Sequence, residues 1–485
     1  MNKIHFVTGL MLLLNLQSPV CAQAPGWMLN KGQHSIEEIN DSISRMMRDV
    51  GVSALSLAVI KNDEIVYFHG YGYKQMPDKD QVDTETLFQA GSLTKSFLVL
   101  VVYQLVDQGL LDLDKPMYQY LEYPQLDHDA RYKRITPRMI MSHCSGIENW
   151  KSDNNPDTLE IVSNPGEKFV YSGEGYVYLS KIVALILHKP YTEYIEDLVI
   201  RPLGLRRSFS HFSPDGTYPQ NYALGHGNFG KEFKKEKLIV PDPAGSMNMT
   251  AQDYAKLILA IFSRKYLSEN RIRDILHPII QLDSATPGYF YGPGFVLIFS
   301  NNDTIISHGG STVGFRASMY YSTVSKNGFV YLTNSDRGEV LAKKMSEYTV
   351  GLNLDKTFKS DLYDQYPSDA IDCMKIYREK GPAAFLTAID ALEKKSNNKS
   401  LLRTLNELGY VYLEEDAAIS RKLLEDDVKI NSGSSLAVYL LGLADMRSGE
   451  YRLAYDNFIR ARELHFDDES LDQYIKECKE KISKK

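Results

Sequence analysis

Two strand-rich segments that lie far apart in the chain constrain its fold most strongly. The first segment, residues 53–74, reads SALSLAVIKNDEIVYFHGYGYK, two β-branched and aromatic runs joined by a turn around residues 61–63. Further strand-like runs return at residues 292–299, 315–322 and 328–334, after a long stretch of helical patterns and Pro- and Gly-bearing loops. We therefore predict an α/β (α+β) domain over residues 30–355, whose mainly antiparallel sheet is built from both ends and flanked by helices.

Residues 366–482 have a different character, with nearly continuous helical patterning and no convincing strand. Two Leu-Gly pairs, Leu408-Gly409 and Leu441-Gly442, recur about one repeat length apart, a spacing that resembles the tetratricopeptide repeat over about residues 398–466. The alternative is an ordinary pair of helical hairpins. Because so few repeats bury little surface, we expect this all-helical region to pack against the first domain or against a protein partner.

The N-terminus predicts export. The sequence MNKIHFVTGLMLLLNLQSPVCAQA has an apolar run too short to span a bilayer, followed by small residues, which predicts a signal peptide over residues 1–22. We expect a periplasmic or secreted protein. A lipoprotein anchored through Cys21 is the alternative, but SPVC matches a lipoprotein box poorly.

Composition narrows the function classes. A formal net charge of -7 gives no reason to expect nucleic-acid binding, and no later stretch approaches the ~20 apolar residues of a transmembrane helix. Beyond the predicted signal peptide, Cys144, Cys373 and Cys478 lie far apart, so neither a zinc site nor a disulfide framework is indicated. No cluster of ligands suggests a metal or an organic cofactor.

One segment carries an ionisable pair into an apolar environment. Residues 87–114 read LFQAGSLTKSFLVLVVYQLVDQGLLDLD, with Ser92 and Lys95 on one face at the start of a predicted helix. Burial would lower the pKa of Lys95, so that its neutral amine could take the proton of the Ser92 hydroxyl. The alternative is a lysine that reaches water from the helix end. A second Ser-x-x-Lys, SNNK at Ser396, lies in a polar stretch, and we expect it at the surface.

Six ordered blocks stand out over about residues 35–350. They are SLTK (92–95), ITPRMIMSHCSGIENW (135–150), NPGEKFVYSGEGYVYLSKIVALI (164–186), VIRPLGL (199–205), PAGSMNMTAQDYAKL (243–257) and ISHGGSTVGF (306–315). In this order the blocks resemble the serine β-lactamase and penicillin-binding-protein superfamily. The resemblance is strongest to the branch of class C β-lactamases, D-stereospecific peptidases and β-lactamase-like esterases.

The resemblance implies roles for individual residues. Ser92 would be the nucleophile, Lys95 its base, and Tyr171, in the second motif, a proton relay to the leaving group or from the attacking water.

The third motif, usually Lys-Thr-Gly, corresponds to His308, Gly309 and Gly310 on an edge strand that would line the site. The glycines would let a substrate backbone approach closely. The backbone N–H groups of Ser92 and Ser311 would form the oxyanion hole.

Two departures from the family pattern weaken the case for an optimised β-lactamase. Gly173 stands where many relatives have an asparagine whose amide would bind substrate or the catalytic lysine, unless Glu174 or another group replaces it. His308 stands where relatives have lysine, so a substrate carboxylate would be recognised less firmly. A Ser-His-Asp triad through His143 is disfavoured, because no Gly-x-Ser-x-Gly elbow surrounds Ser92.

These observations predict an exported serine hydrolase that acts on small esters or on D-amino-acid and cell-wall peptides through a Ser92 acyl-enzyme. The alternative is a catalytically weak, penicillin-binding-like binding module that recruits a partner through its helical tail. A true β-lactamase is the third reading.

Overall fold

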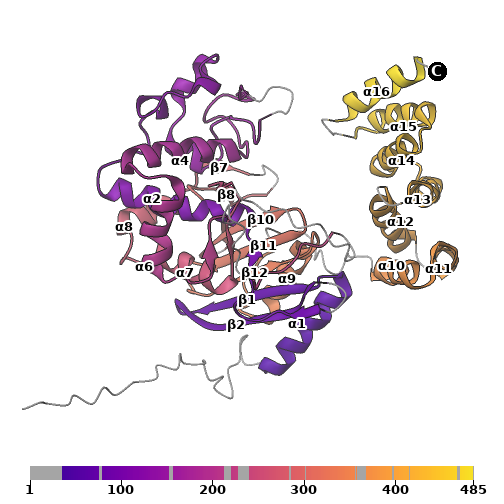
Figure 1. The fold of residues 1–485 in the computed structure, drawn as a ribbon, viewed down its shortest axis with the longest axis horizontal. Helices are drawn as coiled ribbons and strands as arrows, with labels where there is room; N and C mark the ends of the chain where they lie inside the picture. The colour runs from indigo at the N-terminus through magenta and orange to yellow at the C-terminus, as the bar shows by residue number, and fades with distance from the viewer. Residues whose placement is uncertain are drawn as a thin grey trace, which may run out of the picture.

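The computed structural model describes residues 35–75, 79–151, 157–211, 220–227, 240–282, 286–300, 302–355, 357, 368–395, 398–413, 416–466 and 470–483. Figure 1 shows a mixed domain built on a sheet, followed in sequence by a stack of helices. The predicted signal peptide, Cys21 and Ser396 lie outside the described residues. Within the described part of the chain, no helix has the length and apolar character needed to cross a membrane.

The central sheet has nine strands in the order β3-β2-β1-β12-β11-β10-β9-β8-β7, and all neighbouring strands are antiparallel. The strands are β1 (Ala54–Lys61), β2 (Glu64–Gln75), β3 (Lys79–Gln81), β7 (Ile280–Gln281), β8 (Tyr289–Tyr291), β9 (Val296–Ser300), β10 (Asp303–Thr312), β11 (Phe315–Ser322) and β12 (Gly328–Thr333). Pairing of β1 with β12 confirms that one sheet joins the two ends of the domain. The run expected at 292–299 begins later, at Val296, because residues 292–295 turn the chain between β8 and β9.

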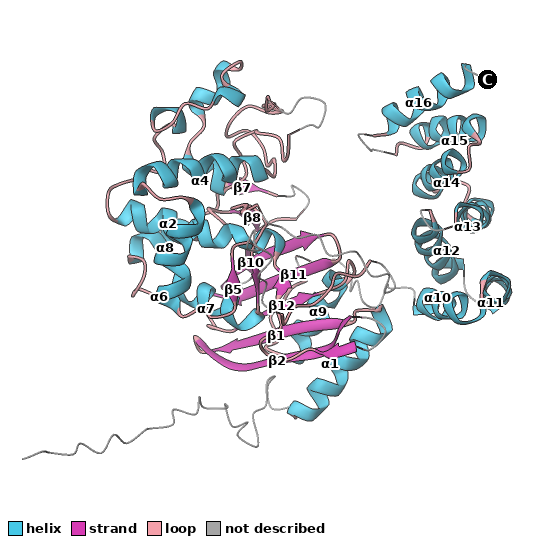
Figure 2. Cartoon of the chain, in the orientation of Figure 1, coloured by secondary structure: helices cyan, strands magenta, loops and turns pink. Residues whose placement is uncertain are grey.

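Helices cover both faces of the sheet (Figure 2). Alternate residues of β1 enter different cores: Ala58 packs with α2 (Lys95–Asp107), α4 (Gly173–Leu187) and α7 (Ala251–Ile261), whereas Leu57 packs with α1 (Ile36–Val50) and α9 (Ala342–Tyr348). This alternation follows from the two-residue period of a strand, and it makes three layers. The predicted fold class is confirmed. The remaining α-helices of the domain are α3 (Pro137–Met141), α5 (Tyr191–Ile195), α6 (Arg201–Leu203) and α8 (Glu269–Ile275).

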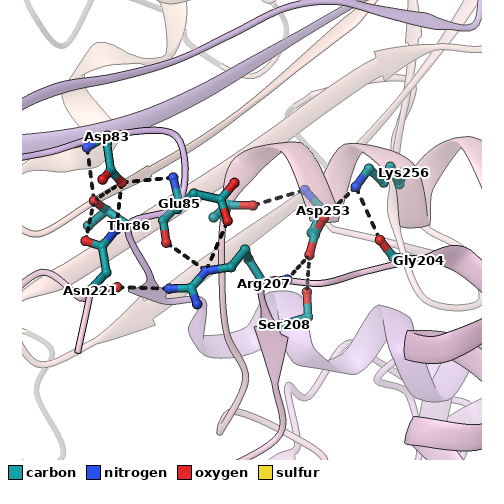
Figure 3. A network of polar contacts seen from close by, with 10 residues as sticks. Asp83, Glu85, Thr86, Gly204, Arg207, Ser208, Asn221, Asp253 and Lys256 are labelled. Carbon is teal, nitrogen blue, oxygen red and sulfur yellow. Dashed lines mark hydrogen bonds and ion pairs between the residues drawn. The ribbon is translucent and has the colours of Figure 1, made fainter. Parts of the chain in front are cut away.

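A small second sheet, of β4 (Phe88–Gln89), β6 (Asn248–Met249) and β5 (Ser208–Phe209), lies beside the start of the apolar segment. A polar network holds it in place (Figure 3). The buried Asp253 carboxylate accepts hydrogen bonds from the backbone N–H of Arg207 at 2.7 Å and from Ser208 Oγ at 3.2 Å, and it pairs with Lys256 at 2.8 Å. Arg207 also donates to the carbonyl of Glu85 at 2.9 Å.

The C-terminal region is all-helical, as predicted. Its helices are α10 (Ser368–Lys380), α11 (Pro382–Lys395), α12 (Asn398–Tyr412), α13 (Ala417–Ile430), α14 (Ser435–Arg447), α15 (Tyr451–Glu463) and α16 (Leu471–Ser483). A Cβ added to Gly409 in α12 would lie 2.5 Å from Leu424 in α13, and one added to Gly442 in α14 would lie 2.7 Å from Phe458 in α15. Both glycines therefore permit close helix packing, which supports the repeat interpretation; the tetratricopeptide assignment stays a prediction. Helix α10 also contacts α1 of the first domain.

Candidate active site

Ser92 lies on a short 3₁₀ turn, residues 91–94, that leads directly into α2. Its place is therefore just before the α-helix rather than within the helix's first turn. Thr94 Oγ1 donates to the carbonyl of Gly91 at 2.6 Å and accepts from the backbone N–H of Met247 at 3.1 Å. The N–H of Ala90 donates to the carbonyl of Met247 at 2.9 Å. These bonds tie the turn that carries Ser92 to the segment that forms β6.

Lys95 is the first residue of α2, and its side chain is fully buried. Its Nζ donates to Ser92 Oγ at 3.1 Å and to the carbonyl of Ala244 at 2.8 Å, and it lies 4.8 Å from the ring centre of Tyr171. Burial lowers the pKa of Lys95 from 10.5 to about 7, against the opposing effect of the Asp242 carboxylate. The structure places a buried lysine beside Ser92, and it excludes the alternative in which the lysine reaches water.

Tyr171 precedes α4, and its hydroxyl is hydrogen-bonded to that of Ser92. Burial raises the pKa of Tyr171 to about 12, more than the Ser92 hydrogen bond lowers it. The phenol is therefore protonated at neutral pH, while an appreciable fraction of Lys95 is a neutral amine. Of the two groups, Lys95 is therefore the one that can accept a proton near neutral pH, and the Tyr171 phenol is the one that still carries its proton.

His143 packs against the Tyr171 ring and bonds to the backbone that leads into α4. Its imidazole stacks on the Tyr171 ring at a centroid distance of 4.0 Å, and its Nδ1 accepts the backbone N–H of Ser172 at 3.1 Å. Burial, together with the charge of Lys95, holds the pKa of His143 well below its usual value, so the ring is neutral. Because its Nδ1 accepts a hydrogen bond from the backbone N–H of Ser172, His143 fixes the start of α4. This arrangement is structural and differs from that of a catalytic triad, in which Nδ1 donates to a carboxylate.

Strand β10 passes in direct contact with the turn that carries Ser92. A Cβ on Gly91 would lie 2.7 Å from the backbone nitrogen of Ser311, and one on Gly310 would lie 2.0 Å from the carbonyl oxygen of Ala90. Both positions therefore require glycine. Strand β9 pairs with residues 303–307 of β10, whereas residues 308–312 pair with β11 alone. The segment beside Ser92 is thus an edge, and Gly309 and Ser311 are exposed on it.

His308 does not present a donor to this edge. Its side chain is 3% exposed, its Nδ1 lies 2.7 Å from the carbonyl oxygen of Gly309, and its Nε2 lies 3.2 Å from Tyr291 Oη. A carbonyl oxygen only accepts, so Nδ1 carries the proton and Nε2 accepts from Tyr291. Burial and the charge of Lys95 lower the pKa of His308 to about 4, so the ring is neutral. The expectation that His308 binds a substrate carboxylate, even loosely, does not agree with this geometry.

Gly173, where relatives have asparagine, is explained by Trp150. A Cβ on Gly173 would lie 2.4–2.7 Å from three atoms of the Trp150 indole. The loop that carries the indole is held to the start of α4, because the N–H of Gly173 donates to Asn149 Oδ1 at 3.0 Å and Ser172 Oγ donates to the carbonyl of Glu148 at 2.8 Å. Trp150 is 48% exposed, and its indole fills the space that a side chain at position 173 would need.

Glu174, considered as a substitute for that amide, is buried in the first turn of α4. Burial raises the pKa of its carboxyl, which accepts the backbone N–H of Lys151. Sequence reasoning did not identify Trp150 or Asp242 as parts of the site. The one available signal was that both lie within or directly beside blocks carrying the family resemblance.

Comparisons with known proteins agree with this arrangement. The sequence profile of the family described as Beta-lactamase matches residues 39–351. Among curated proteins, the chain is 24% identical over 312 residues to "Penicillin-binding protein 4*" of Bacillus subtilis, covering 56% of this chain and 66% of that protein. It is 24% identical over 328 residues to "Protein flp" of Staphylococcus aureus, covering 62% and 63% respectively. The match thus spans just under two thirds of the length of these relatives.

Solved structures share the fold. A penicillin-binding protein homologue from Pyrococcus abyssi, described as octameric, aligns with a TM-score of 0.56 at 23% identity, covering 72% of this chain and 82% of that one. A D-amino acid amidase from Ochrobactrum anthropi aligns with a TM-score of 0.52 at 22% identity, covering 66% and 97%. A class C β-lactamase aligns at 0.56 and 19% identity, covering 65% and 95%. With a family match over most of its length, the chain belongs to the β-lactamase family, within the serine β-lactamase and penicillin-binding-protein superfamily.

Proposed function

We propose that the protein is a serine hydrolase that works through an acyl-enzyme on Ser92. The observation that carries this proposal is the fully buried Lys95 amine, 3.1 Å from Ser92 Oγ, with a pKa lowered to about 7. A lysine costs stability in such a place, and a base for the adjacent hydroxyl is the use that this geometry fits.

In acylation, neutral Lys95 takes the proton of Ser92 as Oγ bonds to the substrate carbonyl carbon. The backbone N–H groups of Ser92 and Ser311, brought together by the contact between Gly91 and β10, would stabilise the oxyanion. The bond to the leaving group then breaks. The Tyr171 phenol gives its proton to the leaving group and regains one from Lys95. Water attacks the acyl carbon by the reverse proton path and releases the acid.

We propose that the substrates are small esters or D-amino-acid and cell-wall peptides. We also propose that the enzyme is exported and acts on them outside the cytoplasm. The unpaired edge at residues 308–312 supports an extended acyl donor lying beside β10. One neighbour in fold is named as a D-amino acid amidase solved with L-phenylalanine amide. A β-lactamase ranks lower, because neither ring nitrogen of His308 is free to donate to a carboxylate.

A binding module with weak turnover is the second candidate, and Gly173 favours it because the amide that family members use is missing. The helical tail would then recruit a protein partner. The intact Ser92, Lys95 and Tyr171 cluster argues for turnover, since binding alone does not need a base whose pKa is tuned beside a nucleophile.

Turnover of a chromogenic acetate ester, a D-phenylalanine amide and a chromogenic cephalosporin tests the proposal. The mature protein should hydrolyse the ester or the amide faster than the cephalosporin, and Ser92→Ala should abolish this. Ser396→Ala, which removes the other Ser-x-x-Lys serine, is the matched control and should retain full activity. Equal rates for Ser92→Ala and the wild type would contradict the proposal.

A further inference from the structure

A turn before β6, residues 242–246, presents a backbone carbonyl to the buried lysine. The Ala244 carbonyl accepts from Lys95 Nζ at 2.8 Å, and the Ala244 N–H donates to Asp242 Oδ1 at 2.8 Å. One residue, Ala244, therefore links the carboxylate of Asp242 to the amine of Lys95. This carboxylate has no role in the reaction as described above.

Several bonds fix the geometry of this turn. The backbone N–H of Asp242 donates to Ser246 Oγ at 2.8 Å, and the N–H of Ser246 donates to the Asp242 carbonyl at 3.1 Å. The backbone N–H of Met247, the next residue, donates a hydrogen bond to Thr94 Oγ1 in the turn that carries Ser92. The Asp242 side chain adds a hydrogen bond within this turn, to the Ala244 N–H. Its loss would therefore loosen the Ala244 carbonyl that holds Lys95.

We propose that Asp242 is a positioning residue for Lys95: its carboxylate fixes the Ala244 carbonyl against the amine and places a negative charge one residue away from it. This inference rests on the proposed function, in which Lys95 is the base for Ser92. It adds a group outside the Ser92, Lys95 and Tyr171 cluster that sets the pH at which the cluster works.

Burial and the Asp242 carboxylate act on the pKa of Lys95 in opposite directions. Burial lowers the pKa of Lys95, and the only effect that raises it among those resolved for the described residues is the charge of Asp242. Among the described residues, the other titratable groups facing the amine are neutral at pH 7: His143, His308, Tyr171 and Tyr176.

Within the part of the chain that the structure describes, Asp242 in turn faces two titratable groups besides Lys95, namely Glu174 on α4 and Tyr191 on α5. Burial raises the pKa of Asp242, whereas the Ala244 N–H and Lys95 favour its charged form.

Two substitutions separate the charge of Asp242 from its hydrogen bond. Asp242→Asn keeps an oxygen for the Ala244 N–H but removes the charge, so the pKa of Lys95 should fall and the acid limb of the pH–rate profile for ester hydrolysis should move down by about one unit. Asp242→Ala should show the same shift and also a lower maximal rate, because the Ala244 carbonyl is no longer held. Asp253→Asn is the matched control, since Asp253 likewise accepts a backbone N–H but lies in the network of Figure 3, and it should not move the acid limb.

A second readout does not depend on catalysis. The difference in unfolding free energy between Lys95→Met and the Lys95 protein should change with pH and level off below about pH 7, near the pKa of Lys95. In the Asp242→Asn background, the level region should begin about one pH unit lower.

The outcomes are distinguishable. An acid limb and a stability difference that Asp242→Asn leaves unchanged would overturn the role of Asp242 while leaving the acyl-enzyme proposal standing. Absence of ester and amide turnover in the wild type would overturn the proposed function, and the stability series would then still decide whether Asp242 sets the pKa of Lys95.

Discussion

Replacing Lys95 by methionine should stabilise the protein at neutral and acid pH while abolishing its proposed activity. Methionine has a similar length and no charge, so it removes the cost of burying an ammonium group in a fully buried site. The fall of the Lys95 pKa from 10.5 to about 7 measures this cost. At roughly 1.4 kcal/mol per pKa unit, the protonated lysine is disfavoured by about 5 kcal/mol relative to the unfolded chain.

Methionine also leaves the Ala244 carbonyl without its Lys95 donor, which costs about 1–3 kcal/mol. The expected net gain for Lys95→Met is therefore about 2–4 kcal/mol at pH 6. The sign of the pH dependence follows from proton binding. Between pH 7 and pH 10.5 the unfolded chain holds a proton on Lys95 that the folded chain has released, so the wild type gains stability as pH rises. The advantage of methionine should shrink over the same interval.

Urea unfolding of both proteins at intervals between pH 6 and pH 10 measures this difference, and titrating groups that do not interact with Lys95 cancel in the subtraction. A difference that does not vary with pH, or a less stable Lys95→Met protein at pH 6, would refute the reasoning. Either result would mean that Lys95 carries an ordinary pKa in the folded protein and is not prepared to act as a base.

Three further outcomes are expected. Ester hydrolysis should rise about tenfold per pH unit below pH 7 and level off above it, as Lys95 loses its proton; a flat profile across pH 5–8 would exclude the lysine as base. Gly173→Asn should lower protein stability because it meets the indole, and Gly173→Asn combined with Trp150→Gly should recover it in thermal unfolding; equal losses in the single and double variants would show that Trp150 is not the obstacle. Gly442→Leu should destabilise the helical tail by about 1–3 kcal/mol through overlap with Phe458, with ester turnover unchanged; an unaltered thermal transition of the tail would contradict close packing there.

The sheet and the Ser92–Lys95 pair could be predicted because each depends on a local pattern. Runs of β-branched and aromatic residues predict strands, and a three-residue spacing places both side chains on one face whether the turn is 3₁₀ or α-helical. The burial of Lys95 was also predictable, since the helix that follows it is apolar on all sides.

Other features depend on contacts between segments distant in sequence. Which ring nitrogen of His308 carries the proton depends on Tyr291. The Tyr291 hydroxyl lies beside the His308 ring because the chain reverses direction twice between the two residues. The indole over Gly173 and the carboxylate behind Ala244 are carried by loops, and the side-chain direction of a loop residue does not follow from any period in the sequence. A motif comparison therefore finds the missing asparagine at position 173 but does not identify Trp150, which occupies its place.

The most direct test of the central claim is the intact mass of the mature protein and of Ser92→Ala after short incubation with an activated acyl ester and, separately, with benzylpenicillin, each quenched in acid. The account predicts a mass increase equal to the acyl group in the wild type with the ester, absent from Ser92→Ala, or ester turnover that Ser92→Ala abolishes where the adduct is too short-lived to trap. An adduct of the same mass on both proteins, or neither adduct nor turnover with either donor, would contradict an acyl-enzyme on Ser92.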